Sequence, residues 1–146
     1  ISDAGCPGVA DPGSEIVALA HRMNCEVRPL VGPSSILLAL MGSGLNGQNF
    51  RFHGYPPVEP AQRDNWIKQT EKASKLEKCT QIAIETPFRN EKLIEALLKN
   101  LSDHTQLCIA RDLTGDEQQI RTLPVAQWRK QVPRAGKMPC LFLWLA

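Results

Sequence analysis

The spacing of hydrophobic residues changes several times along this chain, and each change marks a predicted element. Apolar residues recur at helical spacing over residues 14–23 and 86–101, where Leu93, Leu97 and Leu101 stand four apart. Three further helices are predicted over residues 36–41, 61–78 and 125–131.

Shorter apolar runs between these helices predict strands. They cover residues 26–31, 50–55, 80–85, 105–110, 117–123 and 140–145. Strands and helices therefore interleave along the chain, which is typical of the α/β fold class. Five of these strands lie after residue 45.

A polar, glycine-rich segment over residues 44–49 is the predicted domain boundary, because it separates two patterned regions. Residues 1–45 then form the C-terminal remnant of an N-terminal α/β domain, and residues 46–146 form a complete C-terminal α/β domain. The first part offers only one strand, so we expect further sequence before Ile1 to complete its sheet.

Composition and charge narrow the classes of protein. Hydrophobic residues make up 42% of the chain, enough for a buried core rather than disorder. The net charge of +2 is too small to imply a nucleic-acid partner by itself. The basic run of Arg129, Lys130, Arg134 and Lys137 contains no acidic residue and fits either a solvated loop or a phosphate contact.

The five cysteines and three histidines show no metal-ligand spacing, so we expect no metal site. An odd number of scattered cysteines favours a reducing cytoplasm over an oxidising compartment. The apolar runs are far shorter than the ~20 residues that span a bilayer, so no membrane partner is expected.

The first thirteen residues form a loop rich in glycine and proline. Within it, Ala4, Gly5 and Gly8 leave backbone groups open to a ligand such as an adenine or an amino acid, although a tight turn would explain the same glycines. Asp11 followed by Pro12 is typical of a helix start, so we expect Asp11 to cap the helix that follows.

A second tight loop precedes the helix at residues 36–41. Its Ser34 and Ser35 fit either a helix cap or donors to a cofactor carboxylate. Ligands of open α/β sheets bind beyond the carboxyl ends of strands, where such loops lie.

Charged residues also follow two predicted strands of the second part. They are Glu85, Arg89, Arg111 and Asp112. Two interpretations are open: the ion pairs Glu85–Arg111 and Arg89–Asp112 could tie neighbouring loops together, or these charges could act on a substrate.

Five segments, taken in order, match motifs of one known family. The loop over residues 2–13 is similar to "SDAGTPxxSDPG", and residues 29–35, 52–56, 85–89 and 110–117 are similar to "PLPGPSA", "F-x-GFLP", "ESPHR" and "ARELTK-x-xE". The chain therefore resembles the tetrapyrrole methylase superfamily, the class III S-adenosylmethionine-dependent methyltransferases. It is nearest to the branch with the ribosomal small-subunit RNA 2′-O-ribose methyltransferase.

This resemblance implies a fold and a cofactor. The fold is the C-terminal part of a two-domain α/β protein, with a mixed five-stranded sheet flanked by helices in the second domain. S-adenosylmethionine would bind between the domains of a cytoplasmic homodimer. By their motif positions, the cofactor-binding residues would be Ala4, Gly5, Cys6, Val9, Ser34, Ser35, Thr86 and Leu113.

The resemblance also implies a methyltransferase, whose acceptor is either a ribose 2′-hydroxyl of ribosomal RNA or a tetrapyrrole-type molecule. Glu85 is the candidate base, and Arg89 or Arg111 could position a phosphate. Four positions depart from the motifs, namely Cys6, Phe88, Asp112 and Gly115, and three of these face the substrate side. The alternative is a non-catalytic ligand-binding or dimerisation domain. We expect no turnover from this chain alone, because half of the cofactor pocket would be missing.

Overall fold

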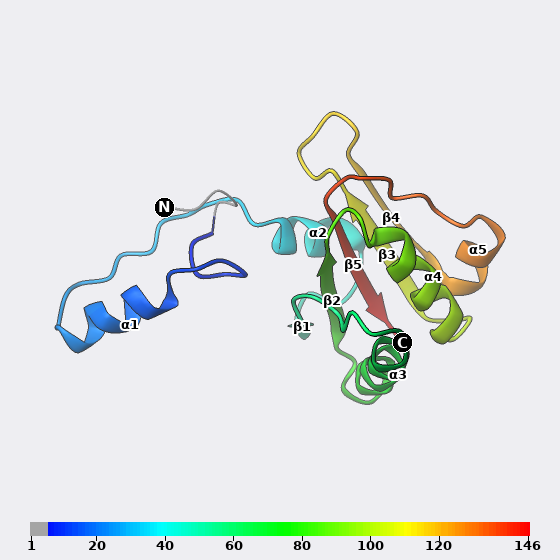
Figure 1. Cartoon of the computed structure of the whole chain (residues 1–146), viewed down its shortest axis with the longest axis horizontal. Helices are drawn as coiled ribbons and strands as arrows, with labels where there is room; N and C mark the ends of the chain where they lie inside the picture. The colour runs from blue at the N-terminus through cyan, green and yellow to red at the C-terminus, as the bar shows by residue number, and fades with distance from the viewer. Residues whose placement is uncertain (1–5) are drawn as a thin grey trace. The chain divides into compact units, whose positions relative to one another are not determined.

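The computed structural model describes residues 6–146, and its contacts divide the chain into two compact units, Ile1–Ser35 and Ile36–Ala146 (Figure 1). The predicted domain boundary at residues 44–49 lies inside the second unit, directly after α2 (Ser35–Ser43). Whether that boundary separates the domains of the family fold stays a prediction.

The first unit contains one helix, α1 (Ser14–Arg22), among its described residues. Its N-cap is Gly13, whose φ of 129° is a conformation that glycine adopts without strain. No side chain caps the helix. The prediction that Asp11 caps this helix is wrong, because the helix begins three positions later. None of the α1 residues is buried.

The prediction of a strand over residues 26–31 is also wrong. The segment is extended but carries no strand, and Leu30 and Val31 are fully exposed. A strand requires a neighbour with which to exchange backbone hydrogen bonds. All strands of the described chain lie in the second unit and pair there.

The second unit is built on one five-stranded sheet. Its strands are β1 (Phe50–Phe52), β2 (Thr80–Glu85), β3 (Gln106–Arg111), β4 (Gln119–Pro124) and β5 (Cys140–Leu145). The strand order is β1-β2-β5-β3-β4, with β1 parallel to β2 and every other pair antiparallel. The expected mixed sheet is therefore confirmed.

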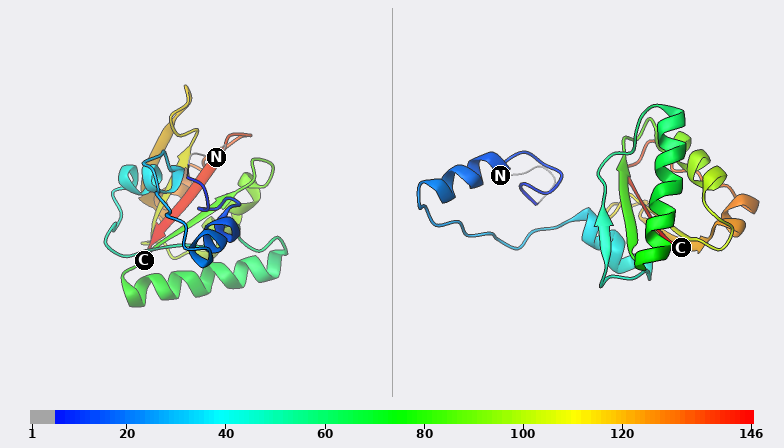
Figure 2. Two further views of the ribbon diagram at one scale, coloured as in Figure 1. Left: turned by 90° about the vertical axis from the view of Figure 1, so that its left-hand side faces the viewer. Right: turned by 90° about the horizontal axis from the view of Figure 1, so that it is seen from below.

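Helices cover both faces of this sheet (Figure 2). On one face, Ile36, Ala39 and Leu40 of α2 pack against residues such as Cys108 and Leu143. On the other face lie α3 (Pro60–Glu77), α4 (Asn90–Asn100) and α5 (Val125–Lys130).

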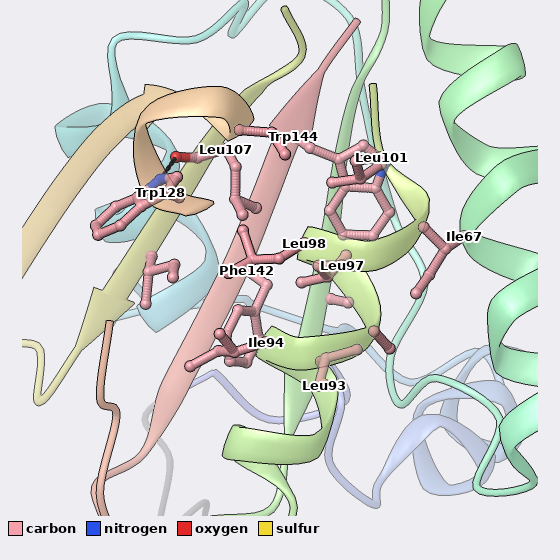
Figure 3. Close-up of a cluster of buried hydrophobic side chains, with 14 of the residues drawn as sticks. Ile67, Leu93, Ile94, Leu97, Leu98, Leu101, Leu107, Trp128, Phe142 and Trp144 are labelled. Atoms are coloured by element: carbon pink, nitrogen blue, oxygen red, sulfur yellow. Dashed lines mark hydrogen bonds between the residues drawn. The ribbon is translucent and has the colours of Figure 1, made fainter. Parts of the chain in front are cut away.

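The larger hydrophobic core lies under α4. Leu93, Ile94 and Leu97 are fully buried and face the aromatic side chains of Phe142 and Trp144 (Figure 3). The four-residue spacing of the leucines thus marks the buried stripe of a helix, as predicted.

The start of α4 differs from the prediction. The helix begins at Asn90 rather than at residue 86, because residues 86–89 form a turn in which the Arg89 amide donates to the Thr86 carbonyl at 2.9 Å. At the other side of the core, the indole Nε1 of Trp128 donates to the Leu107 carbonyl at 2.8 Å and joins α5 to β3 (Figure 3).

Candidate functional site

One edge of the sheet gathers the charged residues that sequence analysis selected. Strands β2 and β3 run in the same direction, because each is antiparallel to β5 between them. Glu85 and Arg111, the last residues of these two strands, both stand in register with Cys140. Since residues in register point to the same face, Glu85 and Arg111 flank Cys140 on the face that carries α4.

Glu85 pairs with Arg89 rather than with Arg111. One carboxylate oxygen, Oε1, accepts from the Thr86 amide at 2.6 Å and from Nε and Nη2 of Arg89 at 2.9 and 2.7 Å. The Glu85 side chain is 3% exposed and that of Arg89 is 31% exposed. The predicted Glu85–Arg111 pair is therefore wrong, since the turn over residues 86–89 brings the nearer arginine onto the carboxylate first.

Arg111 has no acidic partner in the described part of the chain, and its Nε is buried without a hydrogen bond. The expected Arg89–Asp112 pair is also wrong, because Asp112 turns back into its own loop. Its Oδ2 accepts from the Glu117 amide at 2.8 Å.

The thiol of Cys140 lies between these charges and is nearly buried. Burial raises the pKa of Cys140 to about 11, while the Arg111 guanidinium lowers it and the Glu91 carboxylate raises it further. Cys140 is therefore a small core residue and carries no charge near neutral pH.

The loop after β3 is strained at two positions. Asp112 has φ of 47° and Thr114 has φ of 67°. This is a left-handed backbone conformation that residues other than glycine rarely adopt. Such strain costs on the order of 1 kcal/mol per residue and is concentrated at functional sites. The loop that carries the "ARELTK"-like segment thus has one defined backbone conformation.

The first unit brings the two predicted cofactor loops together. The Cys6 thiol donates to the Pro33 carbonyl at 3.2 Å and lies 3.7 Å from the Gly32 carbonyl. The loop after it turns sharply, with the Val9 amide donating to the Cys6 carbonyl at 3.1 Å and Gly8 at φ of 79°. Two segments that are 27 residues apart in sequence therefore meet within this unit.

The predicted cofactor residues lie in both units. Ala4 and Gly5 fall outside the described residues. Val9 is 50% exposed, Ser35 is exposed, and Cys6, Ser34, Thr86 and Leu113 are half-buried. Leu113 packs on the face of the sheet covered by α2.

Two residues that sequence analysis did not select as site residues lie beside Arg111. Arg121 and Arg134 line the same cavity as Arg111. The basic residues around Arg134, with no acidic residue among them, were the only sequence signal for this cluster, since Arg121 is the only charged residue of its strand. Within residues 6–146 no group of three or more potential ligands could hold a metal ion. No described helix is long and apolar enough to cross a membrane.

Comparison with known proteins identifies relatives across most of the chain. The sequence model of the Tetrapyrrole (Corrin/Porphyrin) Methylases matches residues 1–128. Three relatives carry the name Ribosomal RNA small subunit methyltransferase I. The protein of Vibrio cholerae is 32% identical over 127 residues, which are 87% of this chain and 43% of that protein. The protein of Mesorhizobium japonicum is 37% identical over 122 residues (84% and 40%). That of Halalkalibacterium halodurans is 32% identical over 145 residues (98% and 48%).

The chain thus spans less than half the length of these curated relatives. Among solved structures, the crystal structure of the methyltransferase CobJ matches with a TM-score of 0.62 and 18% identity. The match covers 97% of this chain and 61% of that one, and at this identity it supports the fold alone.

Proposed function

Because the chain belongs to the tetrapyrrole methylase family, we propose that it is part of an S-adenosylmethionine-dependent methyltransferase that modifies a ribose 2′-hydroxyl of small-subunit ribosomal RNA. The names of its relatives in several bacteria support this acceptor. The contact between Cys6 and Pro33 is the observation that carries the proposal, because it joins the two loops whose motifs imply the cofactor.

The described residues of these loops fit the proposed cofactor. A Cβ added at Gly8 would meet no atom within 4 Å, so the loop leaves open space beside its backbone. Backbone amides and the hydroxyls of Ser34 and Ser35 can hydrogen-bond a nucleoside and an amino acid without added charge. The half-exposed side chain of Val9 offers an apolar contact.

The cofactor supplies a methyl group that is activated on a positively charged sulfur. The protein's task is then to hold the acceptor oxygen in line with that group, and such positioning contributes several kcal/mol, up to roughly 10. In this proposal Glu85 is a positioning residue, because its hydrogen bonds fix the guanidinium of Arg89 at the sheet edge. Arg89 and Arg111 then orient the substrate through its phosphates.

We further propose that the whole protein works as a homodimer in the cytoplasm. The five cysteines are all free, which is consistent with a reducing compartment. This chain by itself is expected to show no turnover, since it spans only part of its relatives.

The proposal is tested on the full-length gene product. With tritiated S-adenosylmethionine and unmodified small-subunit ribosomal RNA, we expect label in the RNA and a 2′-O-methyl nucleotide in its nuclease digest. Calorimetry should detect binding of S-adenosylhomocysteine. No heat with that ligand would reject a methyltransferase. Cofactor binding with label transferred only to a tetrapyrrole would reject the RNA acceptor, and cofactor binding without transfer to either would favour a non-catalytic domain.

A further inference from the structure

A cavity of about 210 Å³ lies on the face of the sheet that carries α5, and three arginines line it. Arg111 comes from β3, Arg121 from β4 and Arg134 from the segment after α5. We call this cavity the arginine pocket. It is far larger than the ~15 Å³ that a cavity needs to hold one water, so it has room for a ligand group.

The positive charge of the arginine pocket is not compensated by the protein. Within residues 6–146, the side chains of these three arginines form no ion pair and no hydrogen bond, and the buried Nε of Arg111 has no acceptor. No carboxylate lines the cavity. The nearby Glu91 is held by the amides of Ala135 and Gly136, each at 3.0 Å from its Oε1.

Two arginines outside the pocket, Arg129 and Arg89, are bonded differently. Arg129 donates to the carbonyls of Leu98 and Leu101 at 2.8 and 2.7 Å and pairs with Asp103. Arg89 pairs with Glu85. A buried guanidinium nitrogen without an acceptor is destabilising. The arginines of the pocket therefore need an anion, and the described residues of the chain do not provide one.

Two contacts hold part of the pocket in place before a ligand arrives. The guanidinium of Arg121 lies 5.5 Å from the ring centre of Trp128, in a cation–π contact, and Trp128 is itself fixed by the Leu107 carbonyl. A guanidinium that is already ordered loses less entropy when it binds an anion. The side-chain amides of Gln119 and Gln131 add neutral donors to the wall.

The chemistry of the pocket and its surroundings favours a phosphate on a polymer. Guanidinium groups form paired hydrogen bonds with phosphate oxygens. From residue 121 to the last residue the sequence contains no acidic residue, and Lys130 and Lys137 add positive charges outside the cavity lining. A polyanion with repeated phosphates can contact such additional charges, whereas an isolated carboxylate would use only the cavity.

We propose that the arginine pocket binds a backbone phosphate of the RNA acceptor. This inference rests on the proposed function for its choice of RNA, but the site is distinct from the predicted cofactor residues. Arg111 faces α4 and α5, whereas Leu113 packs on the α2 face of the sheet. The pocket would hold the strand on one face and lead it to the sheet edge where Glu85 and Arg89 lie.

The test measures binding of the 146-residue chain to a fluorescein-labelled single-stranded fragment of small-subunit ribosomal RNA, by anisotropy over a salt titration. The variant R121Q/R134Q removes two pocket charges and leaves the half-buried Arg111 in place. Its control is K75Q/K92Q, which removes two charges from exposed positions on α3 and α4. Circular dichroism would check that both variants keep the wild-type fold.

We expect R121Q/R134Q to bind RNA about tenfold more weakly or worse, and its log–log salt slope to become shallower by ~0.7, because the contact with one phosphate is lost. The control should keep the wild-type slope within error. Equal losses in both variants would overturn the inference, because only net charge would then matter. Unchanged RNA binding in R121Q/R134Q would also overturn it. The same holds if that variant keeps its RNA affinity but binds a porphyrin with carboxylate side chains more weakly than the wild type does.

The full-length protein separates this inference from the proposed function. There, R121Q/R134Q should raise KM for RNA and leave kcat near the wild-type value. If the wild-type protein binds RNA through the pocket but transfers no methyl group to it, the pocket stands and the proposed function fails. If it methylates RNA and R121Q/R134Q has an unchanged KM, the function stands and the pocket inference fails.

Discussion

Replacing Glu85 by alanine tests whether this carboxylate holds the sheet edge together. The side chain is 3% exposed and accepts three hydrogen bonds on one oxygen, two of them from a guanidinium. Its removal leaves the Thr86 amide without an acceptor, at a cost of about 1–3 kcal/mol if water does not reach it. The guanidinium of Arg89 is 31% exposed, so water replaces part of the lost ion pair and that contribution stays near 1 kcal/mol.

We therefore expect Glu85→Ala to lower the free energy of unfolding by about 2–4 kcal/mol. Glu85→Gln should cost about 1 kcal/mol, because its amide oxygen can still accept from Thr86 while the charge is lost. Urea unfolding followed by tryptophan fluorescence measures both, since all three tryptophans lie in the second unit. Glu95→Ala, at an exposed position of α4, is the matched control and should stay within about 0.5 kcal/mol.

A double-mutant cycle with Arg89→Ala isolates the pair. The double variant should cost about 1 kcal/mol less than the sum of the single variants, because each single change already breaks the same contact. Two results would refute the reasoning: a Glu85→Ala effect no larger than that of Glu95→Ala, or strictly additive effects of Glu85→Ala and Arg89→Ala.

Three further predictions concern other parts of the chain. Burial raises the pKa of Cys140 to about 11, so alkylation of the native protein at pH 8 should label the exposed Cys25 and spare Cys140; mass spectrometry showing early loss of the Cys140 thiol would contradict this. The amides that Glu59 caps at the start of α3 lower the pKa of its carboxyl, so its contribution is present above pH ~4.5 and is lost as the pH falls through the folded-state pKa. Glu59→Ala should thus lower Tm at pH 7 and have little effect near pH 3; a difference independent of pH would count against it. Leu97→Ala should lower the free energy of unfolding by about 2–5 kcal/mol, because the Leu97 side chain of α4 is completely buried in the core between the helix and the sheet, and a loss below 1 kcal/mol in urea titration would disprove that packing.

The arrangement of the second unit was predictable from sequence because its elements bury regular stripes. The apolar run at residues 140–145 predicted the last strand of the chain, and β5 (Cys140–Leu145) is buried at its first five positions. The first unit was less predictable, because nothing among its described residues pairs with the segment at residues 26–31. A strand is a property of two segments, and the sequence of one segment reports only its preference.

The positions of the charged residues at the strand ends were predictable, but their contacts were not. Strand ends correctly placed Glu85 and Arg111 at one edge of the sheet. Partner choice depends on local turns: the turn over residues 86–89 directs Arg89 to Glu85 and leaves Arg111 without an acid. Arg121 lies near Arg111 only because β4 pairs with β3, where the partner of Arg121 in register is Ile109. No feature of the sequence near Arg121 indicates that pairing.

The residues after β3 that depart from the family motif fit one another sterically. The carboxylate of Asp112 folds over its own loop to reach the Glu117 amide, and a Cβ at position 115 would overlap both of its oxygens. Glycine at 115 is therefore what allows aspartate at 112 to make this hydrogen bond. Two matched residues on a strained backbone indicate a loop that keeps a defined shape.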